Sequence, residues 1–320
     1  MKRDRYILVA LGISLLLNVF LFLREENTST SPQDNNLQSQ VEKYPYISKR
    51  ILAEIPNDYL INFVDLRSAL RSEVEPYQDQ FAFYFEYLPT GVSIGVNEKD
   101  EFNAASLLKV PIVMGNLLQE EEEGAENMPE TITLTQPMID SRFGDVWKRG
   151  AGAQITREEA IKYALEDSDN TALQALISIT DYKYYERVND GLDVEIKDIQ
   201  ETPVLTMKNY SSILQSLFFS SVVSLEHSQE ILDHLAKSKF KDKLAAGVPD
   251  NIVVANKIGT IDHELYTDCG IVYVPRRPYL LCMLSASEDP VAKERMQKVS
   301  KIVYDFVSDA NKTAPSTSLE

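Results

Sequence analysis

The sequence predicts one α+β domain whose sheet is built from both ends of the chain. Stretches rich in aromatic and β-branched residues occur early, as "FAFYFEYLP" and "GVSIGVN", and again late, as "NIVVANKIG", "CGIVYVP" and "YLLCMLSAS". Between them, from Ala105 to Ala245, most segments have helical patterning. A chain of 320 residues, 44% of them hydrophobic and 25% charged, is long enough to bury a substantial core.

The N-terminal stretch differs in composition and predicts a membrane anchor. Residues 1–5 are basic, and residues 6–23 contain no charged side chain. Eighteen helical residues rise about 27 Å, close to the thickness of the hydrocarbon core of a bilayer. Charged residues follow directly, so we expect a retained transmembrane anchor, with a cleaved signal peptide as the alternative. Lys2, Arg3 and Arg5 predict a cytoplasmic N-terminus and an extracytoplasmic domain at the cell membrane.

The rest of the chain divides by composition into three parts. Residues 24–43 are expected to form a polar linker, residues 44–310 the folded domain and residues 311–320 a loose tail. Helical patterning opens the domain and is clearest in "YLINFVDLRSALRSEVE". The segment "PVAKERMQKVSKIVYDFVSDA" is expected to close it as a helix.

Charge and histidine spacing exclude several function classes. The net charge of −17 argues against a nucleic-acid partner, because phosphate binding requires a basic face. His227, His234 and His263 fit no zinc-ligand spacing, so no metal or other cofactor is expected. The domain is expected to be a monomer.

The two cysteines, Cys269 and Cys282, lie on opposite arms of the predicted hairpin "YTDCGIVYVPRRPYLLCMLSAS". If Val274 pairs with Tyr279, the thiols lie diagonally on one face instead of opposite each other. That spacing is poor for a disulfide, although the sequence leaves a bridge open.

The first motif with chemical potential is the pair Ser106 and Lys109 in "AASLLKVPIVMGNLLQ". Residues three apart share one face of a helix, and a lysine whose pKa is lowered by burial can take the proton of a serine hydroxyl. At a helix start, backbone N–H groups also favour developing negative charge. The pattern alone is not specific, because a second copy, Ser238 to Lys241, occurs in what looks like a charged surface helix.

Two further motifs follow in the chain. "EDSDNTA" contains Ser168, Asp169 and Asn170, a cluster that by itself usually forms a turn or a helix N-cap. "VVANKIGT" is a predicted strand that carries Lys257, which by itself could be a solvated lysine at a strand end. Each motif is weak alone, and their order along the chain is informative.

In this order the three motifs are those of the penicillin-recognising serine enzymes. From about Phe81 to Ala310 the chain resembles the class A serine β-lactamase family, both in these motifs and in the segments around them. The resemblance implies the β-lactamase/transpeptidase-like fold. In that fold an antiparallel sheet flanked by helices lies beside an all-helical half, with the site between them.

The resemblance implies a catalytic role for Ser106, Lys109 and Ser168. Ser106 would attack an acyl carbonyl, and Lys109 would help to deprotonate it. Ser168 would pass a proton toward the leaving nitrogen. Lys109 would then be buried because the polar groups of the site satisfy it.

The resemblance also implies a set of substrate-binding residues. Asn170 would hold the amide side chain of the substrate, and Lys257 would bind its carboxylate. The backbone N–H groups of Ser106 and Thr260 would form the oxyanion hole, with Gly259 beside Thr260 in the same strand.

Three features depart from the family pattern. The family carries a Glu, with an Asn four residues later, that activates the deacylating water. The only glutamates in the corresponding stretch of this chain are Glu195 and Glu201, and neither is followed by an Asn four residues later. Ile258 replaces the usual Thr or Ser of the carboxylate pocket, and no arginine occurs near Asp268 and Cys269 to clamp a carboxylate. We therefore expect acylation to be intact and deacylation to be slow.

The leading functional hypothesis is a β-lactamase-type serine hydrolase that cleaves β-lactam amides through an acyl-enzyme at Ser106. The alternative is a D-alanyl-D-alanine peptidase or penicillin-binding enzyme that acts on the peptide of peptidoglycan. A third hypothesis is a non-catalytic wall-binding module with the same fold, against which the intact Ser106, Lys109, Ser168 and Asn170 argue. Fold alone does not fix the substrate.

Overall fold

The computed structural model describes residues 43–47, 62–192 and 203–309. The chain divides between Pro45 and Tyr46, and every helix and strand named below belongs to the second unit, Tyr46–Glu320.

The predicted anchor at residues 6–23 and the predicted tail lie outside the described residues, as does the predicted linker apart from its last residue. Within the described part of the chain, no helix is long and apolar enough to cross a membrane.

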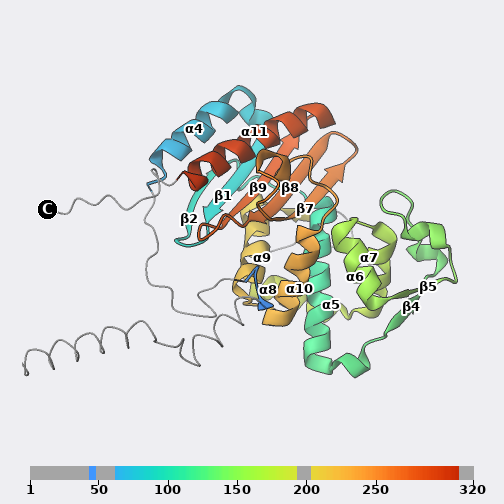
Figure 1. Ribbon diagram of the computed structural model, residues 1–320. Coiled ribbons are helices and arrows are strands. Elements are labelled where there is room, and N and C mark those ends of the chain that lie inside the picture. The colour runs from blue at the N-terminus through green and yellow to red at the C-terminus, as the bar shows by residue number, and fades with distance from the viewer. Residues whose placement is uncertain (1–42, 48–61, 193–202, 310–320) are drawn as a thin grey trace, which may run out of the picture. The chain divides into compact units, whose positions relative to one another are not determined.

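The unit is built around a five-stranded antiparallel sheet of order β2-β1-β9-β8-β7 (Figure 1). Its strands are β1 Phe81–Tyr87, β2 Val92–Val96, β7 Val254–Ile261, β8 Leu265–Val272 and β9 Tyr279–Ala286. Strand β1 pairs with β9 along its whole length, from Phe81 opposite Ser285 to Tyr87 opposite Tyr279. The predicted α+β class, with a sheet built from both ends of the chain, is confirmed.

Helices cover both faces of this sheet (Figure 1). The described helices of the unit, of which only some contact the sheet, are α4 Val64–Val74, α5 Lys109–Glu123, α6 Arg157–Glu166, α7 Asn170–Ile179, α8 Tyr182–Gly191, α9 Met207–Phe219, α10 Leu225–Ala236 and α11 Asp289–Ser308. The first and last, α4 and α11, lie together on one face. The ring of Phe63, next to α4, packs 5.6 Å from Phe85 of β1 and 5.7 Å from Phe306 of α11. Helix α9 packs on the opposite face, against β1 and β9.

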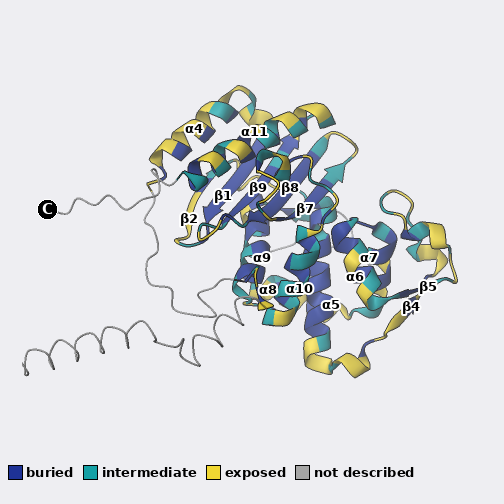
Figure 2. Cartoon of the chain, in the orientation of Figure 1, coloured by how far each residue is buried: buried dark blue, intermediate teal, exposed yellow. Residues whose placement is uncertain are grey.

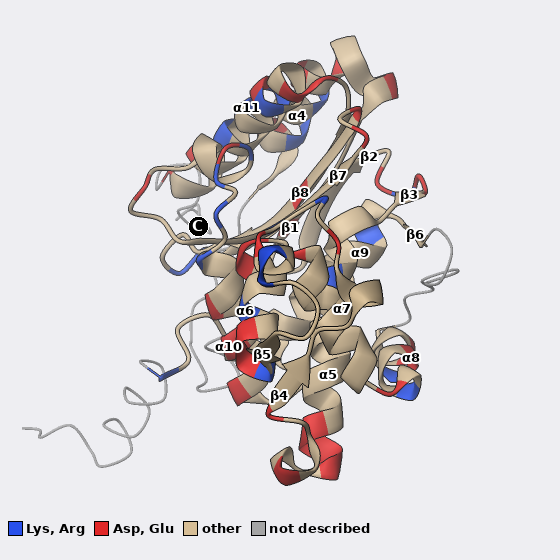
Figure 3. Ribbon diagram, turned by 90° about the vertical axis from the view of Figure 1, so that its right-hand side faces the viewer, with Lys and Arg blue, Asp and Glu red and all other residues tan. Residues whose placement is uncertain are grey.

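Helix α5 is the central helix of the helical half. Its residues from Lys109 to Gln119 are all buried, and Figure 2 shows it dark along most of its length. At Gly115 an added Cβ would lie 2.6 Å from a ring carbon of Tyr185, so the absence of a side chain lets α8 pack closely. The last turn of α5 carries four glutamates, which lie at the outer end of the helix (Figure 3). The buried part of α5 therefore begins at its one lysine.

Two short strand pairs were not predicted. Phe102–Asn103 (β3) pairs with Val204–Leu205 (β6), and Thr131–Thr133 (β4) pairs with Gln154–Thr156 (β5). Segments of two or three residues are too short to show the alternation by which a strand is recognised in sequence.

The predicted register between β8 and β9 is wrong. Val272, not Val274, lies opposite Tyr279, and as a result Cys269 lies directly opposite Cys282. Val274 belongs to the connecting turn, because its carbonyl accepts a hydrogen bond from the N–H of Arg277 at 2.9 Å. Both thiols are free and buried.

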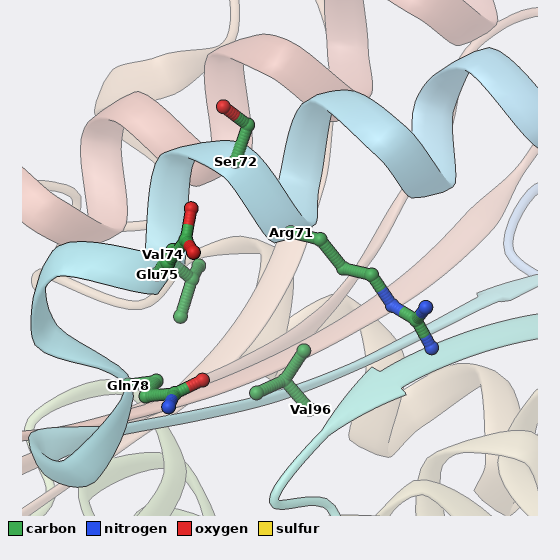
Figure 4. A pocket seen from close by; sticks show the side chains of 6 residues that line it. All are labelled: Arg71, Ser72, Val74, Glu75, Gln78 and Val96. Carbon is green, nitrogen blue, oxygen red and sulfur yellow. The ribbon is translucent and has the colours of Figure 1, made fainter.

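An open groove of about 380 Å³ lies between α4 and β2 (Figure 4). It is lined by Arg71, Ser72, Val74, Glu75, Gln78 and Val96. Because β2 and β7 are the two opposite edges of the sheet, this groove is separate from the residues of the three sequence motifs.

Candidate active site

Ser106 lies in a short 3-10 helix, Ala105–Leu108, that continues directly into α5 at Lys109. The turn before it is tight. Ala105 has a left-handed backbone, with φ of +45°, and its N–H donates to Asn103 Oδ1 at 2.9 Å. A left-handed conformation costs an alanine about 1–2 kcal/mol, and such strain is typical of functional turns. The predicted position of Ser106 at a helix start is confirmed.

Strand β7 lies directly against this turn, and Gly259 is the point of contact. A Cβ at Gly259 would lie 2.5 Å from Thr267 Oγ1 and 3.4 Å from Ala105 Cβ, so a side chain does not fit without displacing the neighbouring strand or the turn. This close approach brings the strand that carries Thr260 next to the turn that carries Ser106. The two N–H groups assigned to an oxyanion hole thus come from adjacent segments.

Lys109 is buried, with 1% of the residue exposed. Its ammonium group donates to Ser168 Oγ at 3.2 Å, to Asn170 Oδ1 at 2.7 Å and to the backbone carbonyl of Ser168. Burial lowers the pKa of Lys109 to about 7, against the opposing effect of the nearby Asp169 and Asp140 carboxylates. A lysine with this pKa can act as a base at neutral pH.

The second lysine reaches the same hydroxyl from the sheet. Lys257 Nζ donates to Ser168 Oγ at 2.7 Å and to the carbonyl of Ile258 at 3.1 Å. Burial, and then the charge of Lys109, lower the pKa of Lys257 well below its usual value. Because a hydroxyl accepts two hydrogen bonds and donates one, Ser168 keeps its own proton free to donate to a third group.

Asp169, between Ser168 and Asn170, holds two segments together. Its carboxylate accepts from Ala172 N at 2.8 Å, which caps α7, and from Val146 N at 2.8 Å, which fixes the loop before α6. That loop passes so close that a Cβ at Gly144, where φ is +83°, would lie 2.0 Å from Asp169 Oδ2. The N-cap is one of the two interpretations that the sequence allowed, whereas the link to Val146 has no sequence signature.

Asp140 is a further residue that the sequence did not indicate. Its N–H donates to Thr171 Oγ1 at 3.0 Å, and its carboxylate accepts from Arg142 through the backbone and the guanidinium. Hydrogen bonds from Arg142, with a smaller one from Asn170, lower the pKa of Asp140 to about 2. Both carboxylates that influence the pKa of Lys109 are therefore engaged in structural bonds.

The other residues singled out from the sequence lie around this cluster. Lys241, of the second serine-lysine pair, was predicted to lie in a surface helix. This prediction is wrong, because Lys241 lies in the segment after α10. It donates to Asn256 Oδ1 at 2.8 Å and to Val254 O at 2.8 Å, because the chain has left the helix and passes behind β7. Ile258 lies opposite Asp268, as the pairing of β7 with β8 requires. Glu195 and Glu201 lie outside the described residues.

Two of the three histidines pair with carboxylates. His227 contacts Glu121 at 2.6 Å, and His234 contacts Glu166 at 2.8 Å. No group of three metal-ligating side chains occurs in the ranges that the structure describes.

Comparison with known proteins gives consistent results. The family model described as "Beta-lactamase enzyme family" matches residues 65–307. Beta-lactamase 3 of Bacillus cereus is 23% identical over 255 residues, which cover 74% of this chain and 79% of that protein.

Two solved structures share the fold. A PBP-A variant, an acyl-enzyme complex with penicillin G, superposes with a TM-score of 0.68 at 21% identity, over 75% of this chain and 95% of that one. A class A beta-lactamase from Mycobacterium abscessus superposes with a TM-score of 0.65 at 20% identity, over 74% and 97%.

The two bonds of Asp169 predict the effect of removing its carboxylate. Asp169→Ala should lower the free energy of unfolding by about 1–3 kcal/mol, because a helix cap and a buried backbone N–H both lose their partner. Asp181→Ala, which removes the cap of α8 together with an exposed ion pair to Lys183, and lies away from Lys109 and Lys257, is the control. Denaturant unfolding measures both. A loss in Asp169→Ala no larger than that of the control would contradict the second bond.

Proposed function

Since the chain belongs to the beta-lactamase enzyme family, we propose that it is a serine hydrolase that cleaves β-lactam amides through an acyl-enzyme at Ser106. The observation that carries the proposal is the buried hydrogen-bond network of Lys109, Ser168 and Lys257, which lies beside the turn of Ser106. The names of the Bacillus relative and of the penicillin G complex support the same substrate class.

Lys109 is the base in the first step. The three acceptors around its Nζ suit the ammonium form, which has three protons to donate. With a pKa of about 7, a large fraction of Lys109 is neutral at neutral pH. The neutral amine keeps two of these bonds, and its lone pair accepts the Ser106 proton while Ser106 Oγ bonds to the acyl carbon.

Ser168 is the acid in the second step. Both lysines donate to its oxygen, at 3.2 Å and 2.7 Å, so its proton is directed away from them. The C–N bond of the substrate breaks as this proton moves to the leaving nitrogen, and the proton held by Lys109 replaces it. In its charged form Lys257 pairs with the substrate carboxylate. The negative charge of this carboxylate raises the pKa of Lys257, which burial had lowered.

A second function is favoured by one observation, the missing Glu-x-x-x-Asn pair. Without that pair the acyl-enzyme loses an activated water and should persist. A D-alanyl-D-alanine peptidase or penicillin-binding enzyme acts on cell-wall peptide. Its function therefore does not require rapid hydrolysis of a β-lactam adduct. The lifetime of the adduct therefore separates the two functions.

Covalent labelling tests the proposal. A fluorescent penicillin should label the purified protein, Ser106→Ala should abolish labelling, and Lys109→Ala should slow it by about 10²-fold or more, because the nucleophile loses its base. Intact-mass spectrometry over time follows the adduct. Rapid turnover supports a β-lactamase, a persistent adduct supports the penicillin-binding function, and no adduct in a folded protein would refute both.

The pH dependence of acylation follows from the lysine pKa values. Because neutral Lys109 is the base, the second-order rate constant should rise about tenfold per pH unit at acidic pH and level off above about pH 7. A stopped-flow pH profile measures this rise, and a rate independent of pH between 5 and 8 would exclude Lys109 as the base.

We further propose that residues 6–23 anchor the protein and that its catalytic domain is extracytoplasmic, because the apolar stretch is long enough to span and is preceded by basic residues. Before protease is added, the domain should fractionate with the membranes. Protease added to intact spheroplasts should then digest it. Complete protection in intact spheroplasts, with digestion only after lysis, would overturn this topology.

A further inference from the structure

The two cysteines of the chain lie directly opposite each other in neighbouring strands of the sheet. Cys269 of β8 pairs with Cys282 of β9, and each is buried, with 0% of the residue exposed. Opposite residues of an antiparallel pair have Cα atoms about 4.5 or 5.5 Å apart, depending on the hydrogen-bond pattern. Both separations lie within the range of about 4.4–6.8 Å that a disulfide spans. The backbone therefore has the spacing that a bond between the two sulfurs requires.

The two thiols also share one face of the sheet and interact with each other. Side chains alternate along a strand, so residues directly opposite each other point to the same side. Burial, and then a hydrogen bond with the Cys282 thiol, raise the pKa of the Cys269 thiol well above its usual value. The contact between the thiols thus agrees with the register of the strands.

Helix α9 covers the pair with the side chain of Tyr210, which is itself buried. Burial raises the pKa of Tyr210 well above its usual value, and the neighbouring groups that add to this effect include both cysteines. The hydroxyl of Tyr210 has no hydrogen-bond partner within the part of the chain that the structure describes. A buried thiol with a raised pKa is inert, because the thiolate is the reacting form. The sulfurs are therefore accessible to a dissolved oxidant mainly before α9 packs on the sheet.

We propose that Cys269 and Cys282 form a cross-strand disulfide when the protein folds in an oxidising medium. One cysteine thiolate attacks a sulfur of a small disulfide such as oxidised glutathione, and the S–S bond of that disulfide breaks to release a thiolate. The other cysteine then attacks the mixed disulfide and releases the second glutathione thiolate. Two cysteine thiols are oxidised, one small disulfide is reduced to two thiols, and the two thiol protons pass to these products.

The disulfide would lie in the row of the sheet that contains the site lysine. Lys257 of β7 is opposite Cys269, and Tyr84 of β1 is opposite Cys282. A bond that closes a loop of about 15 residues favours the folded state about 100-fold, because it restricts the unfolded chain. An extracytoplasmic protein meets the oxidising conditions in which such bonds persist. The inference does not depend on acylation of Ser106.

Equilibration with glutathione measures how far the fold favours the bond. Full-length protein in mild detergent is reduced and unfolded in guanidinium, and is then either refolded or kept unfolded in mixtures of reduced and oxidised glutathione. After an acid quench, maleimide labelling and intact-mass spectrometry count the free thiols of the chain, which has only two cysteines. The equilibrium constant for bond formation should be about 100-fold larger in the folded protein. A ratio below about tenfold would overturn the proposal.

A matched variant tests whether direct opposition of the cysteines is what favours the bond. Leu280 lies opposite Ile271, so the double change Cys282→Ser and Leu280→Cys moves the second thiol to a diagonal position on the same face. Diagonal residues are about 7–8 Å apart, too far for the Cβ separation of about 3.5–4.5 Å in a disulfide. The unfolded variant closes nearly the same loop, whereas its folded state should not favour the bond. A ratio as large as that of the unaltered protein would contradict the proposal.

Denaturant unfolding gives a second measurement that needs no folded double variant. Reduction of the bridged protein should raise its unfolding equilibrium constant by the same factor of about 100, because the two experiments form a closed thermodynamic cycle. Cys269→Ser cannot close the bond, so the reductant should leave its unfolding curve unchanged. A bridged protein no more stable than its reduced form would refute the disulfide as part of the native fold.

Discussion

The burial of the Lys109 ammonium is the constraint on which the site depends. An ammonium group with 1% exposure must be paired or neutral. Its acceptors come from Ser168 and Asn170, which lie 59 and 61 residues later in the chain. The turn between α6 and α7 is therefore held at the N-terminal end of α5. Asp169 then determines where the loop before α6 lies, because its carboxylate binds that loop.

The electrostatics of the cluster suit an anionic substrate. Two lysines share one hydroxyl oxygen, and each cation disfavours the charge of the other. The carboxylates that act on Lys109 are already engaged, Asp169 with backbone N–H groups and Asp140 with Arg142. Burial therefore disfavours the charged form of both lysines beside Ser168. A substrate carboxylate that entered here would relieve the repulsion and gain more than it would at an exposed lysine.

Backbone strain and close packing complete the arrangement. Ala105 and Ser168 both have left-handed φ angles, +45° and +55°, although neither is a glycine. Such conformations persist only where the surroundings impose them. The left-handed conformation of Ala105 is imposed by α5, whose first eleven residues are buried, and by β7, which approaches the turn at Gly259. The stability of the packed sheet and helices therefore supports the geometry of the reactive turn.

The sequence by itself determined the elements and the residue types of the site. Period and composition predicted the strands at both ends of the chain, α11, and the placement of Ser106, Asp169 and Lys257 at a helix start, a cap and a strand. These features are local, since a few neighbouring residues decide them. Only the tertiary structure decided the rest. The turn bond of Arg277 shifted the β8–β9 register, the packing behind β7 took Lys241 out of a helix, and Asp140 joined the site. Each of these outcomes depends on a contact between distant segments, and neither charge nor periodicity within one segment specifies such a contact.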